Sequence, residues 1–212
     1  MLTLLLLILS PVILFIFRVM YLIINVLTSD CKLEKPHQHL RTLLCIGSGG
    51  HTTELLRLLK SMNLKMYQPR LYVAAESDVS SEVKIHTLEK DGAKEYKFCK
   101  IPRSRSVNQS YVSSIFSTLH ATLSTIPIVY NFKPDVIFCN GPGTCIPICI
   151  VAFLLRCVFV LDCRIVFVES ICRVRTLSLT GKILQCFADI IIVQWPQLKD
   201  VCYRGKYFGR LT

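Results

Sequence analysis

The sequence predicts an α/β fold, in which a Rossmann-like parallel sheet is anchored by one N-terminal transmembrane helix. Three observations lead to this prediction. Short β-branched apolar runs alternate with longer helical segments, glycine-rich turns follow two of the runs, and a long apolar segment opens the chain. Strands of a parallel sheet are buried on both faces, so they read as continuous apolar runs separated by helices.

The opening segment, residues 1–27, is apolar at nearly every position, Arg18 being one exception. As a helix it would be about 40 Å long, enough to cross a hydrocarbon core of about 30 Å. A cleaved signal peptide is the alternative, but no positive charge precedes the run and no small-x-small site follows it. Lys32, Lys35 and Arg41 follow the run, so the positive-inside rule predicts a single span with the remaining chain in the cytosol.

The polar residues 28–40 are expected to form a linker, and residues 41–212 a single globular domain. The chain has 25 Lys+Arg against 14 Asp+Glu, and its net charge of +11 suits an anionic membrane face or phosphate ligands. No basic stretch is interleaved with aromatic residues, so no nucleic-acid partner is expected. A hydrophobic content of 52% excludes global disorder.

The apolar runs and helical segments alternate along this domain. We expect the helix that begins at 144 to be buried, because its apolar run is too short to span a bilayer; the alternative is that it lies against the membrane. Ligands of such a sheet bind at the carboxyl ends of the strands. The expected strands are 42–46, 70–74, 95–99, 135–139, 164–168 and 189–193, and the expected helices are 52–62, 80–88, 110–130, 144–155 and 179–187.

A glycine-rich turn follows the first expected strand and leads into a helix. Backbone N–H groups in such a turn, together with the helix N-terminus, favour an anion such as a phosphate. The turn is neither a P-loop nor a full dinucleotide fingerprint, and dinucleotide binding stays an alternative, with Glu76 or Asp78 as the ribose ligand. The turn contains Gly47, Ser48, Gly49, Gly50, His51 and Thr52, of which His51 is a candidate general base or simply part of the helix cap.

A second glycine turn, with Asn140, Gly141, Gly143 and Thr144, follows the fourth expected strand. Two such turns at neighbouring strand ends would hold one diphosphate between them. The alternative is that this Gly-Pro-Gly sequence is ordinary turn chemistry.

Two charged segments complete the candidate site. Glu169 ends the fifth expected strand and Arg173 follows it, which suggests a sugar-hydroxyl acceptor beside a phosphate ligand, or else a structural ion pair. Residues 103–106, Arg-Ser-Arg-Ser, are either a phosphate contact or a solvated loop. None of the eleven cysteines forms a C-x-x-C pair, so no metal site and no cofactor are predicted.

Five stretches together resemble a known family: GSGGHTTEL, PRSRSVNQSY, NGPGTCIP, VFVESICRVRTLSLTGK and VQWPQL. They resemble, in the same order, the membrane-anchoring subunit of the eukaryotic UDP-N-acetylglucosamine transferase of dolichol-linked oligosaccharide synthesis. The resemblance covers Arg41 to the C-terminus. It implies that this chain is the N-terminal half of a GT-B glycosyltransferase, similar to the acceptor-binding half of the bacterial enzyme that forms lipid II.

The resemblance also implies an activity. The complex would add the second GlcNAc, in β1,4 linkage, to GlcNAc-diphosphodolichol at the cytosolic face of the endoplasmic reticulum, with the N-terminus of this chain in the lumen. This chain would bind the acceptor and recruit a separate soluble subunit that binds UDP-GlcNAc, and it would be inactive alone. The alternative is a non-catalytic membrane scaffold that only docks a soluble enzyme.

The family's site residues carry over onto the motifs above. The two glycine turns match its acceptor loops, and Glu169 and Arg173 match the segment that lines its cleft. His51 is the first candidate for the catalytic base and Glu169 the second. The family also implies that the C-terminal segment docks the partner subunit through Tyr207, Phe208 and Leu211; the alternative is a frayed end.

Overall fold

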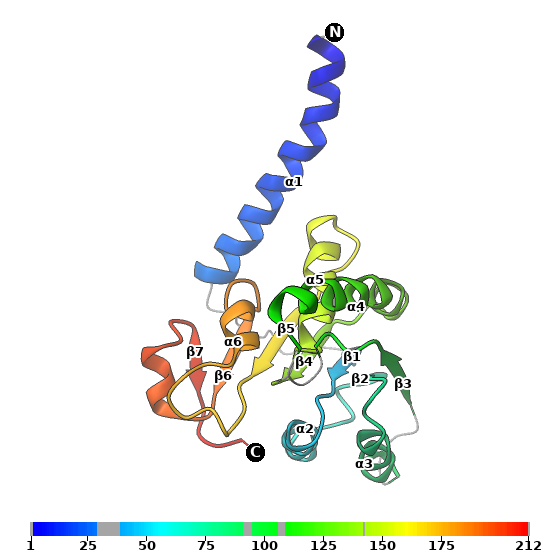
Figure 1. Ribbon diagram of the computed structural model, residues 1–212, viewed down its shortest axis with the longest axis vertical. Coiled ribbons are helices and arrows are strands. Elements are labelled where there is room, and N and C mark those ends of the chain that lie inside the picture. Colours follow the sequence, from blue (N-terminus) through cyan, green and yellow to red (C-terminus); the bar gives the residue numbers. More distant parts are fainter. Residues whose placement is uncertain (1, 29–38, 91–94, 106–108, 142, 212) are drawn as a thin grey trace.

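The computed structural model describes residues 2–28, 39–90, 95–105, 109–141 and 143–211 (Figure 1). Most of the predicted linker, residues 28–40, lies outside them. A seven-stranded sheet of order β3-β2-β1-β4-β5-β6-β7 forms the centre of the domain, and every neighbouring pair of strands is parallel. The predicted Rossmann-like α/β fold is therefore confirmed.

The six expected strands are all present, each within two residues of the expected bounds. The last expected helix is shorter, because residues 185–188 form turns that lead into β6. The strands are β1 (Thr42–Cys45), β2 (Arg70–Ala75), β3 (Tyr96–Ile101), β4 (Val136–Asn140), β5 (Arg164–Val168), β6 (Ile190–Val193) and β7 (Gly205–Tyr207). The helices are α1 (Leu2–Thr28), α2 (Gly50–Ser61), α3 (Ser80–Glu89), α4 (Tyr111–Phe132), α5 (Cys145–Cys157), α6 (Leu179–Leu184) and the 3₁₀ helix η1 (Pro196–Asp200).

Helices cover both faces of the sheet, α4 and α5 on one face and α2 and α3 on the other (Figure 1). Alternate residues of β1 and of the position after it contribute to two separate cores: Leu43 and Cys45 pack with α5, while Leu44 and the following Ile46 pack with α2. This double burial explains why the strands read as continuous apolar runs. The expectation that α5 is buried is confirmed, and Arg156 near its end forms a buried ion pair with Asp189 at 2.8 Å.

The edge strand β7 was not predicted from the sequence. It has only three residues, one of them glycine and one lysine, so no apolar run marks it. It pairs with β6 in register, Ile192 opposite Lys206. Just before it, the Arg204 guanidinium donates to the carbonyl oxygens of Gln185 and Ala188, at 3.1 and 2.8 Å. The alternative of a frayed end therefore does not hold for residues 203–211.

Helix α1 projects from the side of the domain on which α5 lies (Figure 1). Its segment Leu9–Thr28 is long and apolar enough to cross a membrane. Leu22 and Val26 near its C-terminal end are buried, and the Arg18 guanidinium lies 4.1 Å from the centre of the Phe159 ring in the α5–β5 loop. The last turns of α1 thus pack against the domain.

Helix α4 contains a second segment, Val112–Phe132, that is long and apolar enough to cross a membrane. It is, however, the helix that connects β3, at the edge of the sheet, to β4 near its centre. Ala121, Thr125 and Val129 form a buried stripe at four-residue spacing that faces the domain. Helix α4 therefore belongs to the layer that covers the sheet.

Candidate functional site

The two glycine turns lie side by side at the carboxyl ends of two central strands of the sheet. Strands β1 and β4 are parallel neighbours with Cys45 opposite Cys139, so the turns that follow them begin at the same level. Gly141 has φ +80°, and a Cβ built on it would lie 2.2 Å from Nδ1 of His51. Only glycine fits there, because a side chain would be strained and would displace the imidazole.

His51, Asn140 and Glu54 form a chain of hydrogen bonds across the two turns. Nδ1 of His51 lies 3.0 Å from Oδ1 of Asn140, whose Nδ2 donates to Oε2 of Glu54 at 3.0 Å. A carboxylate only accepts, so the Asn140 amide must turn its Oδ1 to the histidine. His51 then carries its proton on Nδ1, which leaves Nε2 with the lone pair that a general base requires.

Glu54 is a site residue that the sequence reasoning missed. It is buried, and its other oxygen accepts from the Ser170 hydroxyl at 2.8 Å, which ties the β1 turn to the end of β5. A signal for it was available, since Glu54 precedes Leu58 by one helical turn and so lies on the buried face of α2. A carboxylate on an apolar face indicates a polar network beneath the helix.

Thr52 supports the first turn from within. Its buried hydroxyl donates to the Gly47 carbonyl oxygen and lies 2.6 Å from the hydroxyl of Ser81. Ser48, Gly49 and Gly50 are exposed. Direct ligand contact by these residues stays a prediction, and the observed hydrogen bonds of Thr52 hold the shape of the turn.

Glu169 is fully buried at the end of β5. Its carboxylate accepts from the backbone N–H groups of Ser170 and Ser178, at 3.1 and 2.9 Å, and from the Ser178 hydroxyl at 3.0 Å. Burial raises the pKa of the Glu169 carboxyl, and these hydrogen bonds oppose the rise. A Cβ at Gly181 would lie 2.5 Å from Oε2, so the glycine lets α6 approach the carboxylate.

Arg173 lies exposed on the loop that follows Glu169. Within the described part of the chain, the two residues form no ion pair. Because Glu169 is fully buried and His51 is only partly buried, the geometry makes His51 the better placed of the two candidate bases. The catalytic role of Glu169 and the phosphate-binding role of Arg173 stay predictions.

A cavity of about 610 Å³ adjoins the glycine turns. Ser48 of the first turn and Gly143 and Thr144 of the second belong to its wall. The segment that follows β3 supplies Arg103, Ser104 and Arg105, which the sequence left open as a phosphate contact or a solvated loop. The remaining lining residues come from the strand ends and from α4, α5 and α6: Ile46, Ala75, Ser77, Ser114, Ile115, Thr118, Ile146, Leu179, Thr180 and Ile183.

Comparison with known proteins identifies the family. Residues 42–211 match the family described as "Oligosaccharide biosynthesis protein Alg14 like". The chain belongs to the Alg14 family. The mouse protein named UDP-N-acetylglucosamine transferase subunit ALG14 is 50% identical over 186 residues, which cover 84% of this chain and 85% of that protein. The human protein of that name is 47% identical over 185 residues, with the same coverage. The predicted resemblance is confirmed.

Solved structures show the same fold. MurG from Acinetobacter baumannii matches with a TM-score of 0.53 and 18% identity, over 74% of this chain and 42% of that one. A UDP-N-acetylglucosamine 2-epimerase matches with a TM-score of 0.51 and 13% identity, over 77% of this chain and 42% of that one. This Alg14-family chain thus corresponds to about two fifths of such GT-B-like proteins.

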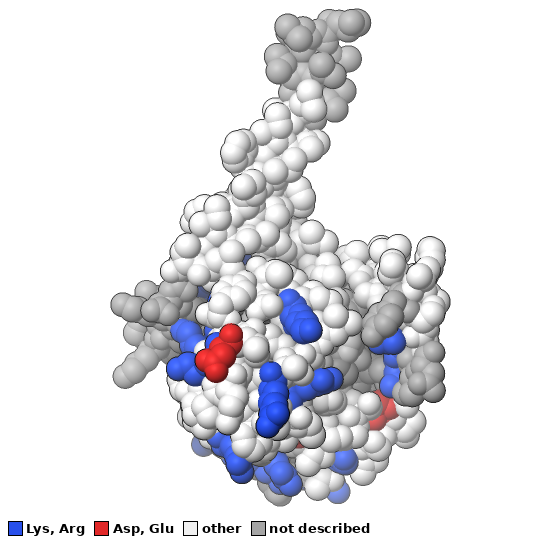
Figure 2. Space-filling view, turned by 60° about the vertical axis from the view of Figure 1, so that its left-hand side comes forward, with Lys and Arg blue, Asp and Glu red and all other residues white. Residues whose placement is uncertain are grey.

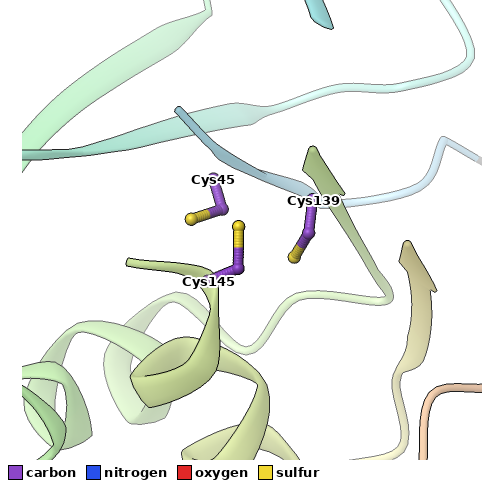
Figure 3. Close-up of side chains that lie close together, drawn as sticks. All are labelled: Cys45, Cys139 and Cys145. Carbon is purple, nitrogen blue, oxygen red and sulfur yellow. The ribbon is translucent and has the colours of Figure 1, made fainter. Parts of the chain in front are cut away.

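Three buried cysteines, Cys45, Cys139 and Cys145, meet beneath the two turns (Figure 3). Their sulfur atoms all lie within 4.8 Å of one another, and Sγ of Cys139 is 3.3 Å from Sγ of Cys149. Sequence spacing did not suggest this cluster, because β1, β4 and α5 bring it together only in the fold. All four side chains belong to the apolar core, and burial raises the pKa of the Cys45 thiol.

An exposed apolar surface lies on the α1 side of the domain. On α4 it includes Phe116 and Leu119, and on the α5–β5 loop it includes Phe159 and Val160. In Figure 2 the end of the domain next to α1 shows few charges, whereas Lys and Arg gather farther from the helix. Large apolar side chains gathered on an exposed surface often mark a protein or membrane contact.

The C-terminal segment offers a further exposed group. Tyr207 on β7 and the following Phe208 are exposed, whereas Leu211 is partly buried and its N–H donates to Oε1 of Gln194 at 3.1 Å. The Arg210 guanidinium lies 4.2 Å from the centre of the Trp195 ring. The docking role expected for Tyr207, Phe208 and Leu211 stays a prediction, with two aromatic rings available to a partner.

Proposed function

We propose that this chain is the membrane-anchored, acceptor-binding subunit of a heteromeric UDP-GlcNAc transferase. The complex adds the second GlcNAc, in β1,4 linkage, to GlcNAc-diphosphodolichol at the cytosolic face of the endoplasmic reticulum. The names of the relatives support the transferase assignment. The word subunit in those names supports a division of the site between this chain and a soluble partner that binds UDP-GlcNAc. The chain is inactive alone.

The observation that carries the proposal is the hydrogen-bonded chain from Glu54 through Asn140 to His51. The acceptor's 4-hydroxyl must lose a proton as its oxygen attacks C1 of the donor sugar and the UDP leaves. Nε2 of His51 accepts that proton, and the charge that forms on the imidazole is stabilised through Asn140 by the Glu54 carboxylate. General base catalysis of this kind contributes a factor of about 10²–10⁴ to the rate.

The acceptor's diphosphate lies at the two glycine turns in this proposal. Backbone N–H groups at the start of α2 and in the 140–144 turn supply donors, and the N-terminus of α2 supplies a partial positive charge. The hydrogen bond between the turns keeps them in register. Positioning of the acceptor relative to the base then accounts for a large part of the rate.

The membrane arrangement follows from the length of α1. The apolar segment Leu9–Thr28 forms about 30 Å of helix, which matches a hydrocarbon core of about 30 Å. The turns after Arg18, which pack on the domain, belong to this segment. This brings Phe159 and the exposed face of α4 to the headgroup level, where apolar side chains are favoured.

A scaffold that only docks the enzyme is the second candidate function. Exposed Tyr207 and Phe208 suit docking under either function. A scaffold gives no reason for the paired turns, the buried Glu54 or a histidine tautomer fixed for proton transfer. The acceptor-binding function is therefore favoured.

The test is reconstitution in liposomes, with labelled UDP-GlcNAc and GlcNAc-diphosphodolichol as substrates. The wild-type chain with its soluble partner is compared with the partner tethered to the membrane by an unrelated helix. We expect transfer only with the wild-type chain. Full transfer by the tethered partner alone would establish the scaffold function instead.

A further inference from the structure

The cavity beside the glycine turns has a cationic side built by the segment after β3. Arg103 and Arg105 both belong to its wall and are exposed. Nε and Nη2 of Arg105 donate to the Gln109 carbonyl oxygen at 3.2 and 3.0 Å, which orients the guanidinium. Among the described lining residues there is no carboxylate, so this side of the cavity suits an anion.

Between the two arginines, Ser104 presents an unsatisfied hydroxyl. The residue is 2% exposed, and its Oγ finds no hydrogen-bond partner in the part of the chain that the structure describes. Its carbonyl oxygen accepts from Ser117 at 2.6 Å and from Thr118 at 3.2 Å, so the residue is held firmly against α4. A buried hydroxyl without a partner is costly, and a ligand oxygen in the cavity would satisfy it.

Other residues of the cavity wall are aliphatic. Ile115 of α4, Ile146 of α5, and Leu179 and Ile183 of α6 contribute branched side chains, and no aromatic ring lies among the described lining residues. The wall therefore suits a branched alkyl chain better than a nucleobase, which would stack on a ring. Ile115 is exposed and lies one helical turn from Leu119, so the cavity is continuous with the apolar face of α4.

We propose that this cavity is a subsite for a branched-chain lipid diphosphate. Arg103 and Arg105 pair with the phosphate that bears the lipid, Ser104 donates to one of its oxygens, and the aliphatic wall receives the first branched units of the chain. The lipid then leaves along α4 toward the membrane. The inference rests on the proposed acceptor-binding function and assigns its lipid side to residues outside the glycine turns.

Calorimetric titration of the full chain in detergent tests the subsite with farnesyl diphosphate, a soluble branched-chain diphosphate. Inorganic pyrophosphate and farnesol separate the contribution of the charge from that of the chain. We expect farnesyl diphosphate to bind at least about tenfold more tightly than either, since it alone satisfies both sides of the cavity. Equal affinity for pyrophosphate would overturn the assignment of the aliphatic wall.

Variants then locate the binding. Arg103→Gln and Arg105→Gln should each weaken farnesyl diphosphate binding by about tenfold, and Ser104→Ala by about threefold to tenfold. The matched control is Arg57→Gln, which removes an exposed arginine of α2 outside the cavity and should leave the affinity unchanged. Unchanged affinity in all three cavity variants would overturn the inference.

The same variants in the reconstituted complex separate this inference from the proposed function. If the cavity variants raise the KM for the lipid acceptor with little change in kcat, both hold. If wild-type complex transfers GlcNAc but the cavity variants keep a normal KM, the subsite is wrong and the function stands. If the wild-type complex transfers nothing, the proposed function fails, whatever the titrations show.

Discussion

Nδ1 of His51 lies 3.0 Å from Oδ1 of Asn140, and its ring lies directly over Gly141. Three features of the fold, the end of β4, the second turn and the start of α2, therefore fix one imidazole. The arrangement determines which ring nitrogen carries the proton and prevents the ring from tilting toward the second turn. A base held in this way loses little entropy when it meets a hydroxyl.

Replacement of His51 tests the base directly. His51→Gln keeps a polar side chain but has no group that can accept the proton, so we expect kcat of the assembled complex to fall by about 10²–10³-fold. Recruitment of the soluble partner should be unchanged, because the turn keeps its shape. Steady-state kinetics and co-purification measure the two quantities. His86→Gln, an exposed histidine two turns along α3, is the control, and wild-type turnover in His51→Gln would remove His51 from the chemistry.

Asn140 and Glu54 are expected to act through His51. Glu54→Gln removes the negative charge that would stabilise a protonated His51 and leaves one acceptor oxygen in place of two, so the hold on the Asn140 amide and on the histidine tautomer is weakened. We expect kcat to fall by about tenfold or more, with a small change in the KM for either substrate. Glu76→Gln changes an exposed glutamate after β2 in the same way and is the control, for which we expect wild-type kcat and KM. A change confined to KM would show that Glu54 shapes binding only.

Gly141→Ala should destabilise the domain as well as the site. The added methyl group would lie 2.2 Å from His51 Nδ1 at a positive φ, and such strain costs about 1–3 kcal/mol. Thermal unfolding of the full chain in detergent measures the loss. Gly50→Ala is the matched control for stability, since its methyl group meets nothing within 4 Å and adds helix propensity. Equal melting temperatures for the two variants would contradict the packing of His51 on Gly141.

Glu169 predicts a pH dependence of stability. Its pKa in the folded chain is raised by burial, so the folded state binds the proton more tightly than the unfolded state. The contribution to the free energy of unfolding is full below the unfolded pKa, near 4.3, and is lost as the pH rises through the raised folded pKa. Wild type should lose stability relative to Glu169→Gln as the pH rises from about 4. Unfolding of both chains between pH 4 and 7 measures the difference, and an opposite slope would contradict the assigned direction.

The apolar face of α4 should enter the bilayer. Tryptophan introduced at Phe116 in the full chain should be quenched by lipids brominated on their acyl chains, because Phe116 is exposed on α4, which lies on the side of the domain from which α1 projects. Val83→Trp, on the exposed side of α3, should not be quenched. Equal quenching at the two positions would show that α4 does not face the membrane.

The strands could be predicted because burial on both faces gives them continuous apolar runs, and most helices could be predicted as the longer segments between those runs. Strand β7 left no such mark, since its three residues are held by pairing with β6 and by Arg204 rather than by their own apolar side chains. The turns of the candidate site could be located from their glycines. The partners of His51 could not, because only the parallel register of β1 and β4 brings Asn140 to the histidine.

Cys45, Cys139 and Cys145 illustrate the same limit. Cysteine spacing identifies a cluster only when the ligands are close in sequence, and here they come from three separate elements. For Arg103 and Arg105 the residues could be identified from the sequence, but their surroundings could not. Their charge was evident in the sequence, but whether they faced solvent or a cavity depended on how α4 folds back over the sheet.

Because Leu22 and Val26 pack against the domain, α1 is attached to the domain rigidly rather than through a flexible connection. On such a fixed attachment, the proposed base His51 stands at one height above the lipid headgroups. Glycolipids whose reactive hydroxyl sits at that height meet the base without any rearrangement, whereas those with longer glycans carry their terminal sugar past it. A rigid attachment of α1 would thus select glycolipids by their length. The proposed site would accept an early, short intermediate even where longer ones share the same membrane.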